Sequence, residues 1–277
     1  MDVDMDGTAG MRVLHESVLA ASEVLGESLE AAFTLGSLAH GGFATLVSDV
    51  DIALVLANLS ADTDSDIDKI SSLVKARYPG TFAERLSIFW TDWEGVFRGT
   101  GSLGRLPAVD RRDLIESGRL LHGTDRRTQA TSPDTHELVI NGAEFAVGKF
   151  DAQYLAVVRN PGRLLAEGVR ATTKVVLFPV RFMYTLSTER IGRNDEAAAW
   201  YSRTGAAPAL AQAALMWRRQ GIDNPGHAQL LLSEHLVPMY LEFFDAYIEA
   251  VTAVGRADLT RELQQRRARL AATPKET

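Results

Sequence analysis

The sequence predicts an α+β fold in which a small mixed sheet with its helices is followed by a C-terminal helical bundle. In the first 125 residues, segments with helical apolar spacing alternate with short continuous apolar runs. A polar stretch rich in Ser, Thr and Pro then occupies residues 123–135. Beyond it, the periodic segments all have helical spacing. We therefore expect two domains, residues 1–125 and residues 134–277.

The expected elements of the first domain follow in chain order. Residues 11–29 carry apolar side chains at helical spacing, and residues 51–56 (DIALVL) form a continuous apolar run typical of a buried strand. The remaining elements are strands at 31–35 and 86–91, a helix at 65–77 that ends before Pro79-Gly80, a short helix at 111–116 and an edge strand at 120–121. The resulting order of helix, strand, strand, helix and strand describes a small sheet with helices packed on it.

The second domain is expected to be entirely helical. Its predicted helices cover residues 136–158, 161–186, 195–201, 207–219, 237–254 and 259–270. Pro238 suits the first turn of the fifth of these helices, where its missing N–H costs nothing.

Composition excludes several classes of protein. The 277 residues contain no cysteine, which rules out disulfides and thiolate metal sites and fits a cytoplasmic protein. A net charge of −7 argues against a nucleic-acid or anionic-lipid partner. The first ten residues are acidic rather than signal-like, and the longest apolar stretch, residues 175–183, is too short to span a bilayer. We expect no membrane association.

Residues 35–56 (LGSLAHGGFATLVSDVDIALVL) hold the pattern that indicates chemistry. Gly36-Ser37 follows a predicted strand, where free backbone N–H groups and a hydroxyl can hold phosphate oxygens. Asp49 and Asp51 alternate at the start of the next strand, so both carboxylates point to one face. Two like charges so close favour a bound cation, and Mg²⁺ prefers carboxylates together with substrate phosphates. The alternative is structural: Gly36-Ser37 as a turn and residues 48–51 as a cap.

This segment resembles the active-site signature of the DNA polymerase β-like nucleotidyltransferase superfamily, in which Gly-Ser binds nucleotide phosphates and Asp-x-Asp binds Mg²⁺. Residues 174–201 and 144–150 (EFAVGKF) are similar to the helical domain of the aminoglycoside nucleotidyltransferases, which transfer adenylyl groups. The resemblance implies that Gly36 and Ser37 bind phosphate, that Ser48 helps to hold the loop, and that Asp49 and Asp51 ligate Mg²⁺ and are catalytic.

The sequence departs from the family pattern at the third carboxylate. The expected position on the strand at 86–91 holds Ser87, and neither Glu84 nor Asp92 is a clean substitute. The resemblance offers Glu144 as the catalytic replacement, the general base that activates the acceptor, and Lys149 as a triphosphate ligand. The spacing of these two residues is five rather than the family's four, which places them about 140° apart around a helix. Both can equally be solvent-exposed helix residues.

The predicted function is therefore a Mg²⁺-dependent nucleotidyltransferase. It would move a nucleoside monophosphate, AMP from ATP by preference, to a hydroxyl of a small molecule resembling an aminoglycoside. Residues 1–125 would form the nucleotidyltransferase domain, and residues 134–277 would contribute the acceptor-binding domain. Two alternatives stay open: a catalytically impaired nucleotide-binding or regulatory protein, and a protein-AMPylating enzyme of the antitoxin type. A homodimer also stays open, because some superfamily members complete their site across a dimer.

Overall fold

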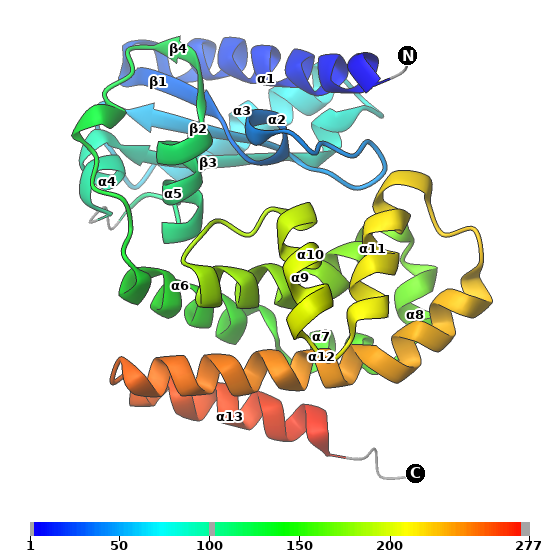
Figure 1. Ribbon diagram of the computed structural model, residues 1–277. Coiled ribbons are helices and arrows are strands. Elements are labelled where there is room, and N and C mark those ends of the chain that lie inside the picture. Colours follow the sequence, from blue (N-terminus) through cyan, green and yellow to red (C-terminus); the bar gives the residue numbers. More distant parts are fainter. Residues whose placement is uncertain (1–2, 100–102, 273–277) are drawn as a thin grey trace. The chain divides into compact units, whose positions relative to one another are not determined.

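The computed structural model describes residues 3–99 and 103–272, which cluster into two compact units, Met1–Pro133 and Asp134–Thr277 (Figure 1). We call them the sheet unit and the helical unit. The elements of the sheet unit are α1 (Val3–Leu25), β1 (Leu29–Thr34), α2 (Gly36–His40), β2 (Val50–Leu56), α3 (Thr63–Arg77), β3 (Leu86–Asp92), α4 (Trp93–Arg98), α5 (Ala108–Ser117) and β4 (Arg119–Gly123).

The four strands form one mixed sheet in the order β3-β2-β1-β4. Strand β1 pairs antiparallel with both β2 and β4, whereas β2 and β3 are parallel and are connected through α3. The predicted strand at 120–121 is thus an edge strand, β4. The mixed sheet and the α+β class agree with the prediction.

The two faces of the sheet are covered by different helices. Alternation along β2 places Ile52 and Leu54 in an apolar cluster that includes residues of α1 and α3. Ala53 and Val55 belong to the opposite cluster, with Val96 of α4 and Leu114 of α5. By the same alternation Asp51 lies on the face of α4 and α5. The strand therefore presents its carboxylate on the side of the sheet where α5 packs.

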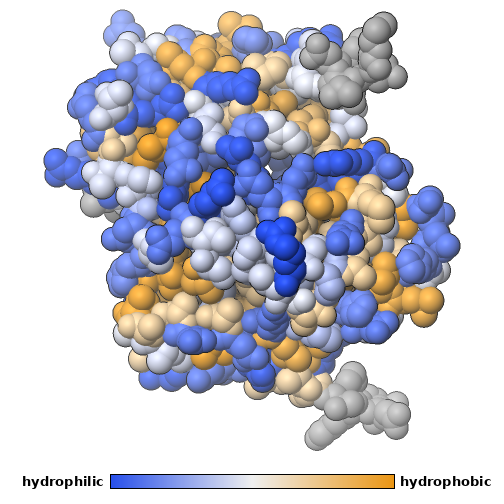
Figure 2. Space-filling model, viewed as in Figure 1, coloured by the Kyte–Doolittle hydropathy of each residue, from blue (hydrophilic) through white to orange (hydrophobic). Residues whose placement is uncertain are grey.

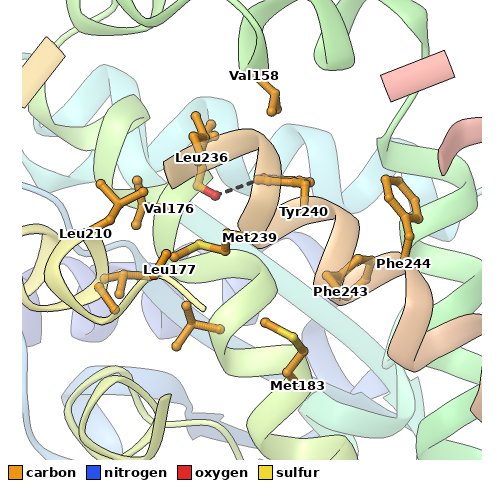
Figure 3. Packing of buried hydrophobic residues seen from close by; sticks show 14 of the residues in the cluster. Val158, Val176, Leu177, Met183, Leu210, Leu236, Met239, Tyr240, Phe243 and Phe244 are labelled. Carbon is orange, nitrogen blue, oxygen red and sulfur yellow. Dashed lines mark hydrogen bonds between the residues drawn. The ribbon is translucent and has the colours of Figure 1, made fainter. Parts of the chain in front are cut away.

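The helical unit has eight α-helices in its described residues. They are α6 (Thr135–Lys149), α7 (Ala152–Val158), α8 (Pro161–Ala166), α9 (Val169–Thr188), α10 (Asn194–Thr204), α11 (Pro208–Gln220), α12 (Pro225–Ala253) and α13 (Ala257–Ala271). Their core is rich in aromatic side chains, among them Phe243 and Phe244 (Figure 3). The Tyr240 hydroxyl is buried with them but donates a hydrogen bond to the Val175 carbonyl at 2.8 Å. Burial and hydrogen bonding thus coexist at this tyrosine.

Two of the predicted long helices are each two helices in the structure. The expected helix at 136–158 breaks after Lys149, because Asp151 accepts the Tyr154 N–H and caps a new helix. The expected helix at 161–186 breaks at Gly168, whose φ of +92° is incompatible with a continuous helix. Both predictions of one continuous helix were wrong for local reasons.

The position of Pro238 was also predicted wrongly. Helix α12 begins thirteen residues earlier, at Pro225, where Asn224 accepts the His227 N–H as a cap. Pro225 takes the first-turn position, and Pro238 lies inside the helix. Helix α4 was not predicted at all; its cap is the Asp92 side chain, which accepts the Gly95 N–H at 2.7 Å.

On the visible face of the molecule, hydrophilic and hydrophobic residues are interspersed (Figure 2). Within residues 3–99 and 103–272, no helix is long and apolar enough to cross a membrane.

Candidate functional site

The two halves of the motif, Gly36 and Asp51, lie in contact at the ends of β1 and β2. The Leu35 N–H donates to the Asp51 carbonyl at 3.0 Å, which continues the pairing of the two antiparallel strands. Gly36 then adopts a φ of +60°, a region that L side chains rarely occupy. A Cβ atom added to Gly36 would lie 2.6 Å from Asp51 Oδ2. Glycine is therefore required here for two reasons: backbone conformation and the close approach of a carboxylate.

The loop between the halves is held by Ser48. Its side-chain oxygen accepts the Ala44 N–H at 2.9 Å, and its own N–H donates to the Ala44 carbonyl at 2.8 Å. Ser48 is buried, while Asp49, directly before β2, is half-buried. Ser37 is half-buried in the short helix α2. The motif residues 36, 37, 48, 49 and 51 thus all lie at or beside the adjoining ends of β1 and β2.

Ser87, where the sequence resemblance predicts a third carboxylate, lies on β3. Ser87 on β3 is in register with Asp51 on the parallel strand β2, so the two residues point to one face of the sheet. Glu84 lies before the strand in a 3₁₀ turn, and the Asp92 carboxylate caps α4. Among the described residues of β3, no carboxylate therefore stands beside Asp51.

A carboxylate that sequence reasoning missed reaches the motif from α5. Asp113 Oδ2 accepts the Gly36 N–H at 2.7 Å, although the two residues are 77 positions apart in the chain. The Asp113 side chain is only 6% exposed, and its Oδ1 is buried with no hydrogen-bond partner. The Gly36 N–H is thus already hydrogen-bonded within the protein. A lone aspartate in a short helix carries no local signal that could have revealed this.

Glu144 and Lys149 both belong to the helical unit. Glu144 is half exposed and forms an ion pair with Arg256 at 3.3 Å; Arg256 also bonds Asp258 and holds the pKa of that carboxyl well below its usual range. Lys149 is exposed, with Nζ 5.8 Å from the centre of the Tyr154 ring. Burial raises the pKa of Tyr154 to about 12. The catalytic and phosphate-binding roles of Glu144 and Lys149 stay predictions.

The donor set at the motif suits Mg²⁺ shared with a substrate better than a cation enclosed by protein alone. Within the described parts of the chain, no group of three or more His, Cys, Asp or Glu residues could hold a metal ion by itself. Mg²⁺ commonly binds through one or two carboxylates and completes its shell with water and substrate phosphates. Asp49 and Asp51 can supply those two carboxylates.

Comparison with known proteins establishes the fold. No protein-family model and no curated protein sequence matches the chain. A crystal structure of spectinomycin adenyltransferase AAD(9) from Enterococcus faecialis, with ATP and spectinomycin, superposes with a TM-score of 0.54 at 11% sequence identity. The match covers 95% of this chain and 99% of that one. The chain has an adenyltransferase-like fold. Because the match spans nearly all of both chains, the likeness includes the helices as well as the sheet.

Proposed function

We propose that the chain is a Mg²⁺-dependent nucleotidyltransferase that transfers AMP from ATP to a hydroxyl group of a small molecule. The observation that carries the proposal is the contact between the motif halves. The Asp51 carboxylate fills the space that a side chain at Gly36 would need. The Gly36-Ser37 turn is thereby held against Asp51, at the start of β2. The adenyltransferase-like fold, seen in a protein crystallised with ATP, supports the same activity.

Each residue of the motif has a role in this proposal. Asp49 and Asp51 would hold Mg²⁺, which supplies charge neutralisation at the phosphates as pyrophosphate leaves. The Ser37 hydroxyl and the backbone N–H groups that follow it would bind the triphosphate, since Asp113 occupies the Gly36 N–H. Ser48 keeps Asp49 in place through its bond to Ala44. The site residues therefore act by positioning and electrostatics, as phosphoryl-group chemistry requires.

The part of the proposal that concerns the acceptor molecule rests on residues of the helical unit. Glu144 would act as the general base that removes a proton from the acceptor hydroxyl, and Lys149 would contact the triphosphate. For this, the Glu144 carboxylate must be released from Arg256, which keeps Asp258 as a second partner. An aminoglycoside-like polycation is the acceptor class that we propose, and the net charge of −7 is compatible with it. Asp49, Asp51 and Glu144 are thus the proposed catalytic residues.

The substitution Asp49→Asn tests the proposal that Asp49 and Asp51 bind Mg²⁺. We expect Mg²⁺-dependent release of pyrophosphate from ATP to be lost, because an amide cannot replace an anionic ligand, while the melting temperature stays within a few degrees of wild type. Asp68→Asn is the matched control, since Asp68 is exposed on α3. Activity of Asp49→Asn at the wild-type level would show that the metal assignment is wrong.

Ser87 favours one second candidate, a nucleotide-binding protein without transferase activity. With Ser87 in register beside Asp51, the sheet lacks the third carboxylate that serves as ligand or base in the superfamily. Titration calorimetry with ATP and Mg²⁺, followed by a search for adenylylated products over a panel of aminoglycosides, separates the two candidates. Binding without any product would favour this second candidate, whereas an AMP-modified acceptor favours the transferase.

A further inference from the structure

We propose that Asp113 is a positioning residue of the nucleotide site, which locks the Gly36-Ser37 turn against Asp51. The inference rests on the proposed function and names a residue outside the motif. Its starting observation is one hydrogen bond: Asp113 Oδ2 accepts the Gly36 N–H at 2.7 Å.

Gly36 is contacted by carboxylates on two sides. Asp113 bonds its N–H, and Asp51 Oδ2 lies 2.6 Å from the point where a Cβ atom of residue 36 would be. Since the N and Cβ positions of one residue are about 2.5 Å apart, the two carboxylate oxygens are at most about 8 Å from each other. Asp113 belongs to α5, which packs on the face of the sheet toward which Asp51 points. The two acidic residues therefore fix the glycine between α5 and β2.

The burial of Asp113 has no evident structural purpose. Asp113 is only 6% exposed, yet its Oδ1 has no hydrogen-bond partner. A buried carboxylate with a single hydrogen bond destabilises the folded state, because desolvation of its second oxygen is not compensated. Leu114, the next residue on α5, belongs to the apolar cluster that also contains Ala53 and Val55 of β2. The helix therefore supplies apolar side chains to this face of the sheet. An aspartate at position 113 is therefore explained by what it does to Gly36.

The positive φ of Gly36 explains why its hydrogen bond to Asp113 matters for the turn. At +60° the glycine can exchange with more extended conformations at little cost, so the direction of the Ser37 hydroxyl is not fixed by the backbone alone. The hydrogen bond to its N–H removes that freedom before the nucleotide arrives. Pre-organisation of this kind raises affinity by lowering the entropy lost on binding. Asp113 acts through Gly36 and touches no substrate atom in this proposal.

The test compares Asp113→Asn with Asp113→Ala. The asparagine side chain keeps an acceptor oxygen for the Gly36 N–H, whereas alanine removes it. We expect Asp113→Ala to weaken Mg·ATP binding about tenfold or more in calorimetry, and Asp113→Asn to stay within about threefold of wild type. Asp113→Asn should also melt at or above the wild-type temperature, because it removes a buried charge. The matched control is Glu116→Ala, an exposed carboxylate of the same helix that pairs with Arg112.

A second measurement works without nucleotide. Solvent exchange of the Gly36 amide proton, followed by NMR, should accelerate in Asp113→Ala and stay slow in Asp113→Asn. If the cavity left by alanine unfolds the chain, Asp113→Leu, which has the same branched side-chain skeleton as aspartate but no acceptor, takes its place. Equal damage from the asparagine and the alanine variants would overturn the proposal, because an acceptor oxygen for the Gly36 N–H would then not be what position 113 supplies. Unchanged Gly36 exchange in Asp113→Ala would overturn it as well.

The two measurements also separate this inference from the proposed function. If the wild-type protein binds no ATP, the proposed function fails. The Gly36 exchange result still decides whether Asp113 holds the turn.

Discussion

Asp113 in the sheet unit and Tyr240 in the helical unit are both buried polar side chains, but they differ in how far their polar atoms are hydrogen-bonded. The Tyr240 hydroxyl bonds the Val175 carbonyl at 2.8 Å and the Tyr154 hydroxyl at 2.6 Å. Asp113 has one oxygen bonded to Gly36 and another with no partner. Fully paired polar groups add specificity to a core, whereas an unpaired one lowers stability. The difference is what we expect if the Tyr240 hydroxyl serves packing in the helical unit and Asp113 serves the proposed nucleotide site.

The largest effect that we predict is that of Gly36→Ala. Alanine at φ +60° costs about 1–2 kcal/mol, and its Cβ would lie 2.6 Å from Asp51 Oδ2, so the turn or the carboxylate must move. We expect a clear fall in melting temperature and loss of Mg·ATP binding, measured by thermal shift with and without ligand.

Gly80→Ala is the matched control for this prediction. Gly80 has a φ of +70°, but an added Cβ would meet nothing within 4 Å. It therefore reproduces the backbone strain without the contact. If both variants lost stability equally and both kept ATP binding, the contact between Gly36 and Asp51 would have no functional weight.

Glu144→Gln sharpens the comparison, because it asks whether the helical unit contributes chemistry as well as stability. If Glu144 is the general base, kcat for AMP transfer should fall about 100-fold with the affinity for Mg·ATP unchanged. Arg256→Gln breaks the same ion pair and should leave kcat within about threefold of wild type. Equal, small effects of the two variants on kcat would instead show that Glu144 only pairs with Arg256. An exposed ion pair of this kind contributes about 1 kcal/mol or less to the stability of the fold.

The smallest effect concerns alkaline stability of the helical unit. Burial raises the pKa of Tyr154 to about 12, compared with about 10 in an unfolded chain. A group whose pKa is raised on folding stabilises the protein fully below its unfolded pKa and loses that contribution as the pH rises through its folded pKa. We therefore expect the melting temperature to fall between about pH 10 and pH 12. Tyr154→Phe should lessen the fall; an unchanged fall would assign it to other groups.

Much of the fold could be predicted because β2 is mostly a continuous apolar run and α3 has clean helical spacing. The motif could be predicted because its residues are close in sequence and lie at a strand start, where alternation fixes their direction. Breaks in the helices were missed because Asp151 and Gly168 act through caps and positive φ rather than through periodicity. Pro238 was misplaced because a long helix packed on a core tolerates an internal proline.

The missed residue of the site has a different explanation. Asp113 meets Gly36 only because β4 returns beside β1 and carries α5 with it. That meeting depends on sheet order, which local patterns do not specify. Contacts between residues far apart in sequence are therefore the part of a site that needs a structure.

The bond from the Leu35 N–H to the Asp51 carbonyl has a consequence for how such a site can diversify. Strand pairing, and not the connecting segment, brings Gly36 and Asp51 together. The two ends of the intervening loop are thus held by strand pairing. Closing a loop twice as long costs only about 0.6 kcal/mol more in free energy. Insertions or deletions between Gly41 and Ala44 should leave the paired ends intact. Grafting loops of other lengths there would give a protein engineer a way to vary what surrounds the site while its two anchored ends stay in register.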